Sequence, residues 1–320
     1  MTKNQFLTDA NQYLSIIVGN AESTSREKAS KLRQYAGIMY SLYEQGRLST
    51  LAASKITADD LNEYVNFRRS QGIAESTIAK DLSIIGGLLT WKNNNARQVY
   101  SVIYGNKKPR AYQGRIDPLS DDIVEKVYQL ARSTSDWTTL RGCMAVILGS
   151  SAGLRPQESR RLYADHINIS PNGSTVYIEH VKGEGKWGKP RRAPIMDDVE
   201  DIYIKYLKMR EEVLKMKGIE SRAMFPPMSG NAEFVQQQSM SRFKSYVEDI
   251  IQEKFELRDA RRAFGQRMLN SGYTMEQVST VMGHDSIKTT QKYYATYRED
   301  DVLGNIFATK NSRRRDTISA

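Results

Sequence analysis

Cysteine and histidine are rare in this chain, which has one cysteine and three histidines among its 320 residues. The single cysteine, Cys143, cannot form a disulfide within the chain, so we expect a reducing, cytoplasmic compartment. So few cysteines and histidines give no cluster with the spacing of metal ligands, and the sequence indicates no metal and no other cofactor. The chain also lacks an apolar run of about 18 residues and a signal-peptide core near its start, which argues against a membrane span and against secretion.

The chain carries more positive than negative side chains. Lysine and arginine number 47 and aspartate and glutamate 37, which gives a formal net charge of +10. A basic surface attracts phosphate polymers, and nucleic acid is the commonest partner of that kind. Charge alone leaves a merely basic globular protein as an equal alternative. The length is sufficient for two ordinary domains.

The first third of the chain predicts helices. Apolar residues recur at helical spacing in residues 28–44, 57–72 and 76–91. Thr57 is a suitable N-cap for the second of these helices. We therefore expect a helical domain over residues 1–105, a small bundle with its own core.

The segment 106–118 is expected to be a linker, because glycine and proline interrupt regular structure there. Its basic side chains are Lys107, Lys108, Arg110 and Arg115. A linker of this charge can follow a DNA backbone, and a solvated linker is the equal alternative.

Residues 119–308 predict a second, mainly helical domain. Its main expected helices lie within 119–152 and at 199–215, 238–254, 260–269 and 275–282. Residues 176–181 and 191–196 flank a Gly-rich basic turn, which is the pattern of a β-hairpin. The fold class is thus mainly α with a small β-hairpin or sheet (α+β). Residues 309–320 are expected to form a basic, disordered tail.

Three arginines are placed to hold a phosphate. Arg258 and Arg261 lie three residues apart and so share one face of a helix. Arg155 precedes Pro156, a favoured first helical residue, so Arg155 stands at a helix N-terminus, where backbone N–H groups also favour an anion. Guanidinium groups can grip phosphate oxygens in pairs. Taken alone, Arg155 fits a surface cap better.

A histidine and a tyrosine follow Arg261. The helix predicted for 275–282 ends at Gly283, which suits a C′ residue with positive φ and leaves His284 just beyond a helix end. A further helical run then presents Tyr293, nine residues after His284. A tyrosine hydroxyl can act as a nucleophile if its proton is removed and the developing charge is neutralised.

These motifs resemble those of the tyrosine recombinase (phage integrase) family. The family box is written H-x-x-R … L-G-H-x-x-x-x-T-T-x-x-Y, and here it reads R-D-A-R, M-G-H and T-T-Q-K-Y, ending at Arg261, His284 and Tyr293. The Gly-Leu-Arg-x-x-Glu sequence ending at Glu158 resembles the first family box. The basic turn resembles the family hairpin G-K-G-x-x-x-R-x-x-P, with Val181 in place of the glycine that usually precedes the lysine.

The resemblance implies a core-binding domain and a catalytic domain that form a clamp around double-stranded DNA. Arg155 and Arg261 would hold the scissile phosphate, and His284 would hydrogen-bond it or help to position the site. Tyr293 would attack the phosphate and form a 3′-phosphotyrosyl bond. Lys182 would protonate the leaving 5′-oxygen as general acid, with Lys186 as the alternative acid. Further DNA-backbone contacts are expected from Lys186, Lys189, Arg191 and Arg192.

One departure concerns Arg258, which stands where the family usually has histidine. Arginine stays protonated, so Arg258 is a poor base, although it can stabilise the phosphate or a developing tyrosinate. The acceptor of the Tyr293 proton is left open between His284 and water. Tyr294 is a rival nucleophile, although the spacing of the threonines favours Tyr293.

The resemblance therefore implies a site-specific DNA recombinase, an integrase or resolvase of a mobile element or virus. It would act in the host cytoplasm or nucleoid, as a homotetramer on paired DNA sites and as a monomer or weak oligomer when free. One alternative is a topoisomerase-like enzyme that relaxes DNA without pairing two sites. The other is a DNA-binding protein that has lost catalysis, for which Arg258 is the only sign.

Overall fold

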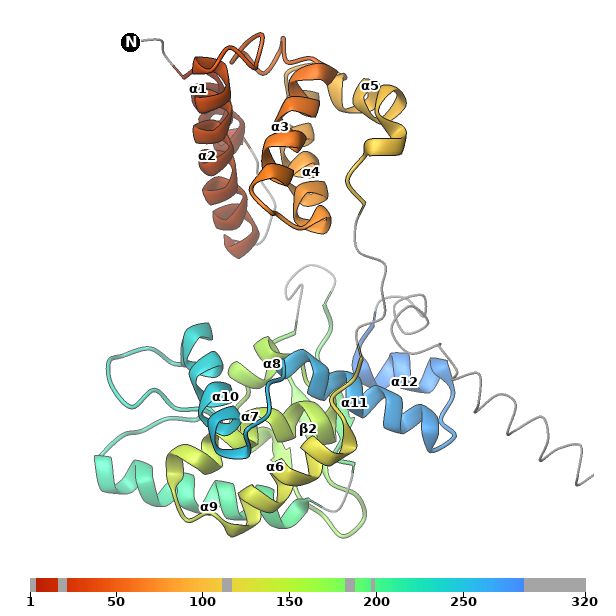
Figure 1. The fold of residues 1–320 in the computed structure, drawn as a ribbon. Helices are drawn as coiled ribbons and strands as arrows, with labels where there is room; N and C mark the ends of the chain where they lie inside the picture. Colours follow the sequence, from red (N-terminus) through yellow and green to blue (C-terminus); the bar gives the residue numbers. More distant parts are fainter. Residues whose placement is uncertain (1–3, 17–21, 111–116, 182–187, 197–198, 285–320) are drawn as a thin grey trace, which may run out of the picture. The chain divides into compact units, whose positions relative to one another are not determined.

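The computed structural model describes residues 4–16, 22–110, 117–181, 188–196 and 199–284. The chain divides into two compact units, Met1–Gly114 and Arg115–Ala320, shown as ribbons in Figure 1. The boundary between them falls within the segment 106–118. Among the described residues, no helix combines the length and apolar character that a membrane span needs.

The first unit is helical, as expected. Its described elements are α1 (Gln5–Ile16), α2 (Glu22–Glu44), α3 (Ala58–Ser70), α4 (Glu75–Trp91), α5 (Ala96–Ile103) and the short 3-10 helix η1 (Gly105–Lys107). Thr57 caps α3 as predicted, because its hydroxyl accepts the N–H of Asp60 at 3.1 Å and the Asp60 carboxylate accepts the N–H of Thr57 at 2.8 Å. No separate helix was predicted for the residues of α1 or of α5.

One buried carboxylate joins three helices of this unit. Asp81 of α4 accepts hydrogen bonds from Tyr35 of α2 at 2.6 Å and from Tyr64 of α3 at 3.1 Å. The guanidinium of Arg68 reaches the same carboxylate at 3.1 Å, and the side chains of Arg68 and Asp81 are only 6% and 1% exposed. Because every member has a partner, this polar cluster fixes how α2, α3 and α4 pack.

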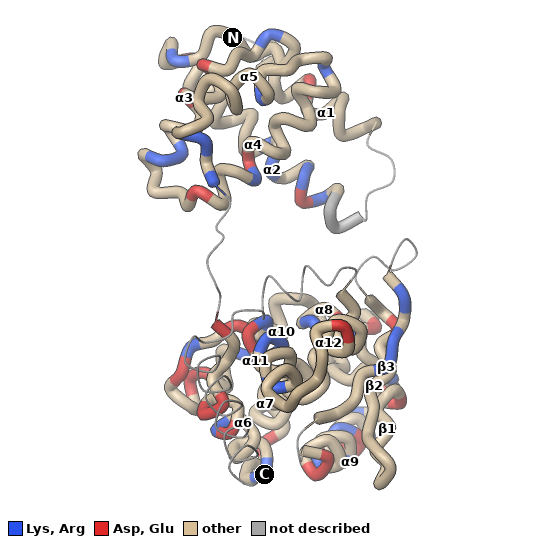
Figure 2. Tube along the Cα trace, turned by 90° about the vertical axis from the view of Figure 1, so that its right-hand side faces the viewer, with Lys and Arg blue, Asp and Glu red and all other residues tan. Residues whose placement is uncertain are grey.

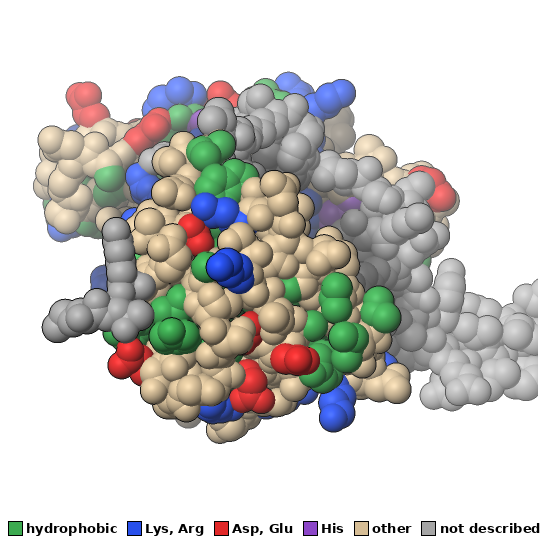
Figure 3. All heavy atoms as spheres, turned by 90° about the horizontal axis from the view of Figure 1, so that it is seen from above, with side chains coloured by type: hydrophobic (Ala, Val, Ile, Leu, Met, Phe, Trp, Pro, Cys, Tyr) green, Lys and Arg blue, Asp and Glu red, His purple; other side chains and the backbone are tan. Residues whose placement is uncertain are grey.

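The first unit also leaves apolar side chains in solvent. Val99, Val102 and Ile103 of α5 are exposed to 37%, 83% and 61%. Figure 3, which views the molecule from above, shows hydrophobic side chains at the surface beside lysines and arginines. A basic surface with apolar spots is compatible with a macromolecular partner.

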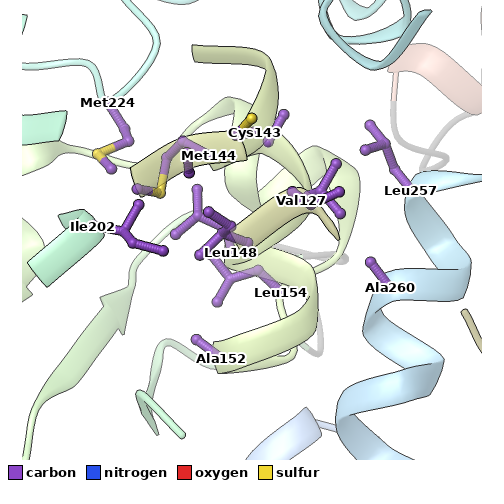
Figure 4. Packing of buried hydrophobic residues seen from close by; sticks show 14 of the residues in the cluster. Val127, Cys143, Met144, Leu148, Ala152, Leu154, Ile202, Met224, Leu257 and Ala260 are labelled. Atoms are coloured by element: carbon purple, nitrogen blue, oxygen red, sulfur yellow. The ribbon is translucent and has the colours of Figure 1, made fainter. Parts of the chain in front are cut away.

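The second unit is built around one buried helix. Its described helices are α6 (Asp121–Ser133), α7 (Trp137–Ala152), α8 (Pro156–Arg160), the 3-10 helix η2 (Ala164–His166), α9 (Glu200–Lys217), α10 (Gln237–Ile251), α11 (Leu257–Asn270) and α12 (Met275–Met282). All residues from Gly142 to Ala152 of α7 are buried. The helices α6, α9, α10 and α11 surround α7. Figure 4 shows Val127, Cys143, Leu148 and Leu257 together in this core.

The expected hairpin is present within a sheet of three antiparallel strands in the order β1-β2-β3. These strands are β1 (Ile167–Asn168), β2 (Thr175–Ile178) and β3 (Arg191–Pro194). The hairpin strands β2 and β3 are shorter than predicted, and β1, with two residues, had no sequence signal. Val176 pairs with Ala193 and Ile178 with Arg191, so this register places Arg191 at the end of the hairpin that leads into the turn. The turn residues 182–187 lie outside the described residues.

A glycine allows α7 and α11 to approach each other closely. A Cβ atom on Gly149 would lie 3.1 Å from the Cβ of Ala260 and 3.3 Å from the backbone nitrogen of Arg261. Glycine therefore lets the backbone of α11 lie against the C-terminal part of α7. This packing brings Arg261 to the residues that follow α7, where the candidate site lies.

Candidate active site

Arg155 stands at the start of α8, as the sequence predicts. It is the N-cap residue, and Pro156 is in the first turn. Its backbone N–H donates to Glu158 Oε2 at 2.8 Å, and its Nη1 donates to Glu158 Oε1 at 2.7 Å. The side chain of Arg155 is 26% exposed, whereas that of Glu158 is 1% exposed. A buried carboxylate thus holds an arginine that still reaches solvent.

Glu158 is the centre of a cluster of three arginines. Arg191 of β3 binds it with both terminal nitrogens, at 3.0 Å to Oε1 and 2.8 Å to Oε2. Nη1 of Arg261 lies 3.6 Å from Oε2. Burial would raise the pKa of Glu158, but the hydrogen bonds and positive charges of Arg191, Arg261 and Arg155 outweigh it and lower the pKa to about 2. Glu158 is therefore ionised at physiological pH.

The C-terminal carbonyls of α12 and the turn after it hold the same arginines. Arg191 Nε donates to Val281 O at 3.1 Å, Arg261 Nη2 to Met282 O at 2.6 Å and Arg155 Nη2 to Gly283 O at 2.8 Å. The last carbonyls of a helix have no partner within the helix and carry partial negative charge, so they attract cations. Arg261 Nη1 also donates to Gly153 O, at 2.5 Å, beyond the end of α7. Backbone oxygens from two helix ends therefore fix the guanidinium groups.

Gly283 ends α12 as predicted and cannot easily be replaced. Its φ is +61°, its N–H donates to Thr280 O at 3.1 Å, and the N–H of His284 donates to Ser279 O at 3.0 Å. This pair of bonds is the Schellman motif, which commonly requires glycine. A Cβ atom on Gly283 would also lie 2.9 Å from Cδ and Nε of Arg191. The turn that presents His284 is thus shaped against Arg191.

His284 is a neutral side chain in a basic environment. Burial lowers its pKa, and the positive charges of Arg261, Arg155 and Arg191 lower it further, to about 3. The imidazole is uncharged at physiological pH, so one ring nitrogen can donate a hydrogen bond and the other can accept one. It suits hydrogen bonding to a phosphate oxygen better than charge neutralisation.

Arg258 differs from the other arginines of the predicted set. It is exposed in the first turn of α11, whereas Arg261, one turn later, is buried. Within the part of the chain that the structure describes, Arg258 makes no hydrogen bond and no ion pair. The predicted Lys182, Lys186, Tyr293 and Tyr294 lie outside the described residues. The structure therefore brings together Arg155, Arg261 and His284 of the predicted catalytic set.

The predicted DNA-binding side chains that the structure describes fall into two groups. Five are exposed, and these are Lys107, Lys108, Arg110, Lys189 and Arg192. Figure 2 shows the basic residues along β3 in blue. Arg191 is different, because its side chain is 12% exposed and its guanidinium is committed to Glu158 and Val281. Arg115, like Lys186, lies outside the described residues.

The sequence did not identify Arg191 as a member of the site, although residues Arg191 to Pro194 read R-x-x-P, as the hairpin pattern ends. It placed Glu158 in the first family box but did not identify its three arginine partners. A carboxylate one helical turn after a candidate phosphate ligand was the available signal. The contacts made by the carbonyls of residues 281–283 cannot be predicted from side-chain identity, because every residue has a backbone carbonyl.

The cluster is suited to binding a tetrahedral or pentacoordinate phosphate. Two arginines with fixed guanidinium planes and one neutral imidazole offer several N–H donors to one small volume. Donors that are already oriented stabilise developing negative charge without reorganising. Among the described residues, no group of three or more His, Cys, Asp or Glu side chains is placed to hold a metal ion.

The chain is similar in sequence to known proteins. A sequence model described as the phage integrase family matches residues 118–300, more than half of the chain. A relative named tyrosine recombinase XerC, from Rickettsia prowazekii (strain Madrid E), is 25% identical over 266 residues, which cover 79% of this chain and 80% of the relative. A second XerC, from Rickettsia bellii (strain OSU 85-389), is 23% identical over 243 residues, 74% of each chain.

Two solved structures have a similar fold. The XerH site-specific recombinase bound to palindromic difH substrate superposes with a TM-score of 0.67 at 15% identity, over 94% of this chain and 83% of that chain. The Tn1549 transposon integrase in complex with circular intermediate DNA gives a TM-score of 0.64 at 15% identity, over 95% and 99% of the two chains. The match to the family model, over more than half of the chain, identifies it as a member of the phage integrase family, the tyrosine-type site-specific recombinases.

Proposed function

We propose that this protein cleaves and rejoins double-stranded DNA through a 3′-phosphotyrosyl intermediate formed by Tyr293. The observation that carries the proposal is the cluster in which Glu158 and the C-terminal carbonyls of α12 hold Arg155 and Arg261 beside the neutral His284. Its two guanidinium groups and its imidazole are the donors that a scissile phosphate requires. Tyr293 follows His284 at the spacing of the family box.

In the proposed step, the Tyr293 oxygen attacks phosphorus while the bond from phosphorus to the 5′-oxygen breaks. Arg155 and Arg261 bind the non-bridging oxygens and stabilise the pentacoordinate transition state, which carries more negative charge than the ground state. His284 donates a hydrogen bond to the same oxygens. The phosphotyrosine retains the bond energy, so the attack of another 5′-hydroxyl on it rejoins the DNA.

Two protons move in this step. Lys182 supplies one to the leaving 5′-oxygen, and Lys186 is the alternative donor. The tyrosine proton goes to water or to His284, whose low pKa makes it a weak base. Arg258 replaces the usual histidine of the family box, and we propose that its charge stabilises the phosphate or the developing tyrosinate from its exposed position in the first turn of α11.

The biological role proposed is integration, excision or resolution of a mobile element in the host cytoplasm or nucleoid. Related proteins named XerH recombinase and Tn1549 integrase have been solved on DNA. By this analogy, residues 1–105 and 119–308 would enclose a duplex as a clamp, with segment 106–118 as the linker between them. Four copies would assemble on paired sites. The exposed Lys107, Lys108, Arg110, Lys189 and Arg192 would contact the DNA backbone, with a salt-dependent affinity.

The test is covalent trapping of the protein on DNA. The full chain is incubated with nicked duplexes that release a short 5′-hydroxyl fragment after cleavage, and the reaction is quenched with detergent. The duplexes come from a pool enriched for binding to this protein. We expect a protein–DNA adduct with wild type and with Tyr294→Phe, and none with Tyr293→Phe.

Each of the other outcomes favours a different hypothesis about the nucleophile or the function. An adduct that survives in Tyr293→Phe and is lost in Tyr294→Phe moves the nucleophile to Tyr294. Binding without any adduct contradicts the proposed cleavage and favours a DNA-binding protein that has lost catalysis. An adduct accompanied by relaxation of supercoiled plasmid, with no recombinant product from paired sites, favours the topoisomerase-like alternative.

A further inference from the structure

His180, just beyond the hairpin strand β2, uses both nitrogens of its ring. Nη2 of Arg161 lies 3.1 Å from Nδ1 of His180, and the hydroxyl of Tyr163 lies 3.4 Å from its Nε2. The Tyr163 hydroxyl donates in turn to Glu233 Oε1 at 2.5 Å. His180 is one of the three histidines of the protein, and the proposed cleavage step does not use it.

These partners assign the tautomer of His180. A guanidinium group has only donors, so Nδ1 accepts the hydrogen bond from Arg161 and Nε2 carries the ring proton. Nε2 then donates to the oxygen of Tyr163, whose own proton points to Glu233. The hydrogen bond to Glu233 is the main cause that raises the pKa of Tyr163 to about 12, so the hydroxyl keeps its proton. Donors and acceptors therefore alternate without conflict from Arg161 to Glu233.

Aromatic rings pack around the imidazole of His180. The centroid of the Phe234 ring lies 5.5 Å from that of His180, with the two planes at 79°. The Tyr163 ring lies at the same distance from His180 and 5.3 Å from Phe234. Edge-to-face and tilted contacts of this kind are favourable arrangements for aromatic rings. Packing and hydrogen bonds thus fix His180 between the end of α8 and the segment that precedes α10.

His180 anchors the hairpin beyond the point where strand pairing ends. The last pair of the ladder is Ile178 of β2 with Arg191 of β3, and His180 lies two residues further along the chain. Its partner Arg161 is the C-cap residue of α8. Arg191, on the other strand, binds Glu158 of the same helix. One short helix therefore holds both strands of the hairpin, through Arg191 on β3 and through His180 beyond β2.

We infer that His180 is a positioning residue, which ties the hairpin to α8 so that Lys182 meets the leaving 5′-oxygen of a phosphate held by Arg155. The inference rests on the proposed function, since it needs Lys182 to supply that proton. Lys182 follows His180 by two residues, which span at most about 7 Å, so a displacement of His180 displaces Lys182. A misplacement of about 1 Å at a reacting group can lower the rate about 100-fold.

The test replaces the leaving 5′-oxygen with sulfur. A hydroxyl group, whose pKa is near the value of about 15.7 for water, needs a proton as it leaves, whereas a thiol of pKa about 8.5 leaves as a thiolate. In the sulfur duplex the bond from phosphorus to sulfur breaks, the electron pair stays on sulfur, and no general acid is required. The scissile position is mapped from the wild-type adduct. Nicked duplexes with oxygen or sulfur at that position are then compared.

The rate of adduct formation is measured in single-turnover reactions of the full chain. The variants are His180→Ala, His180→Gln, Tyr163→Phe and Lys182→Ala. The matched control is His166→Ala, which removes another histidine that packs on Tyr163, with ring centroids 5.2 Å apart. Circular dichroism establishes that each variant is folded. If His180→Ala does not fold, the same comparison is made with Tyr163→Phe.

We expect His180→Ala to slow cleavage of the oxygen duplex by about 10- to 100-fold, and Lys182→Ala by about 10²- to 10⁴-fold. Both variants cleave the sulfur duplex at nearly the wild-type rate, because that step needs no proton. Tyr163→Phe shows a smaller loss of the same kind. His180→Gln keeps most of the oxygen rate, since its amide offers one donor and one acceptor. His166→Ala keeps the wild-type ratio of the two rates.

Three results overturn the inference. If His180→Ala cleaves the oxygen duplex at the wild-type rate, or is equally slow on both duplexes, His180 does not position the acid, and the proposed function stands. If sulfur does not restore Lys182→Ala, Lys182 is not the acid that His180 could position. If wild type forms no adduct with either duplex, the proposed function fails and the inference fails with it.

Discussion

Replacing Glu158 with glutamine tests whether this carboxylate holds the site together. Glutamine keeps the size and one acceptor oxygen but removes the charge that three arginines share. The side chains of Arg191 and Arg261 are only 12% and 8% exposed, so solvent cannot replace the lost charge efficiently. Removing one partner of a buried ion pair is costly because it leaves the others uncompensated. We therefore expect Glu158→Gln to destabilise the second unit.

The size of the effect follows from the pKa of Glu158. The arginines lower it from 4.5 to about 2 in the folded protein. Each pKa unit corresponds to about 1.4 kcal/mol, so the ionised carboxylate contributes about 3 kcal/mol to folding. This value agrees with the loss of folding stability measured when one partner of a buried ion pair is removed, about 3–5 kcal/mol. For a unit of this size, the melting temperature should fall by roughly 6–12 °C.

The assay is urea unfolding of the full chain at neutral pH, followed by circular dichroism, for wild type and Glu158→Gln. The matched control is Glu212→Gln, which removes the charge of an exposed glutamate on α9 and should cost less than about 0.5 kcal/mol. DNA or sulfate should restore stability to Glu158→Gln more than to wild type, because a bound anion replaces the missing negative charge.

Acid provides the second readout for Glu158. The folded-state pKa is depressed, so the stabilising contribution is complete above about pH 4.5 and is lost as the pH falls towards about 2. The difference in stability between wild type and Glu158→Gln should shrink over that window. If Glu158→Gln costs no more than Glu212→Gln, or if the difference stays constant down to pH 2, the carboxylate does not hold the arginines.

Three further predictions concern other parts of the chain. Gly283→Ala should lose at least about 1 kcal/mol more than Gly218→Ala in urea unfolding: both glycines have φ near +60°, but only the new Cβ at Gly283 meets a side chain, that of Arg191. His284 should show no titration in NMR spectra between pH 5 and 8, because its pKa in the folded protein is about 3. Since the unfolded histidine takes up a proton below about pH 6.5, acid there favours the unfolded state. A titration midpoint of His284 near pH 6.5 would contradict the burial argument. Asp81→Asn should lose about 3–5 kcal/mol in the first unit, since it leaves a buried arginine without its counter-charge; loss of under about 1 kcal/mol in thermal unfolding would contradict it.

Local patterns were sufficient to predict most helices of the structure. The Thr57 cap, the proline at the start of α8 and the glycine after α12 each have a local physical cause, so the sequence identifies them. The two-residue strand β1 has no such cause, since it forms only because β2 offers it a ladder of hydrogen bonds. Strand ends depend on the partner strand in the same way, which explains the shorter hairpin.

The sequence predicted the main side chains of the candidate site, but not the contacts that hold them in place. Spacing and resemblance identified Arg155, Arg261 and His284, and the structure brings them together. Arg191 was predicted to contact DNA, but the structure buries most of its side chain. Its burial depends on Glu158, 33 residues earlier in the chain, and on the end of α12, 90 residues later. Sequence distance conceals contacts of that kind.

The charge of the cluster suits a transition state better than a ground state. Three guanidinium groups and one carboxylate, with His284 neutral, leave a net charge of +2 (three positive charges minus one negative). A DNA phosphodiester carries one negative charge, and attack by a tyrosinate adds a second in the pentacoordinate state. Binding that strengthens as charge develops lowers the barrier, whereas equal binding of both states would not. Glu158 sets this balance, because the carboxylate both orients the arginines and lowers the net charge of the cluster from +3 to +2.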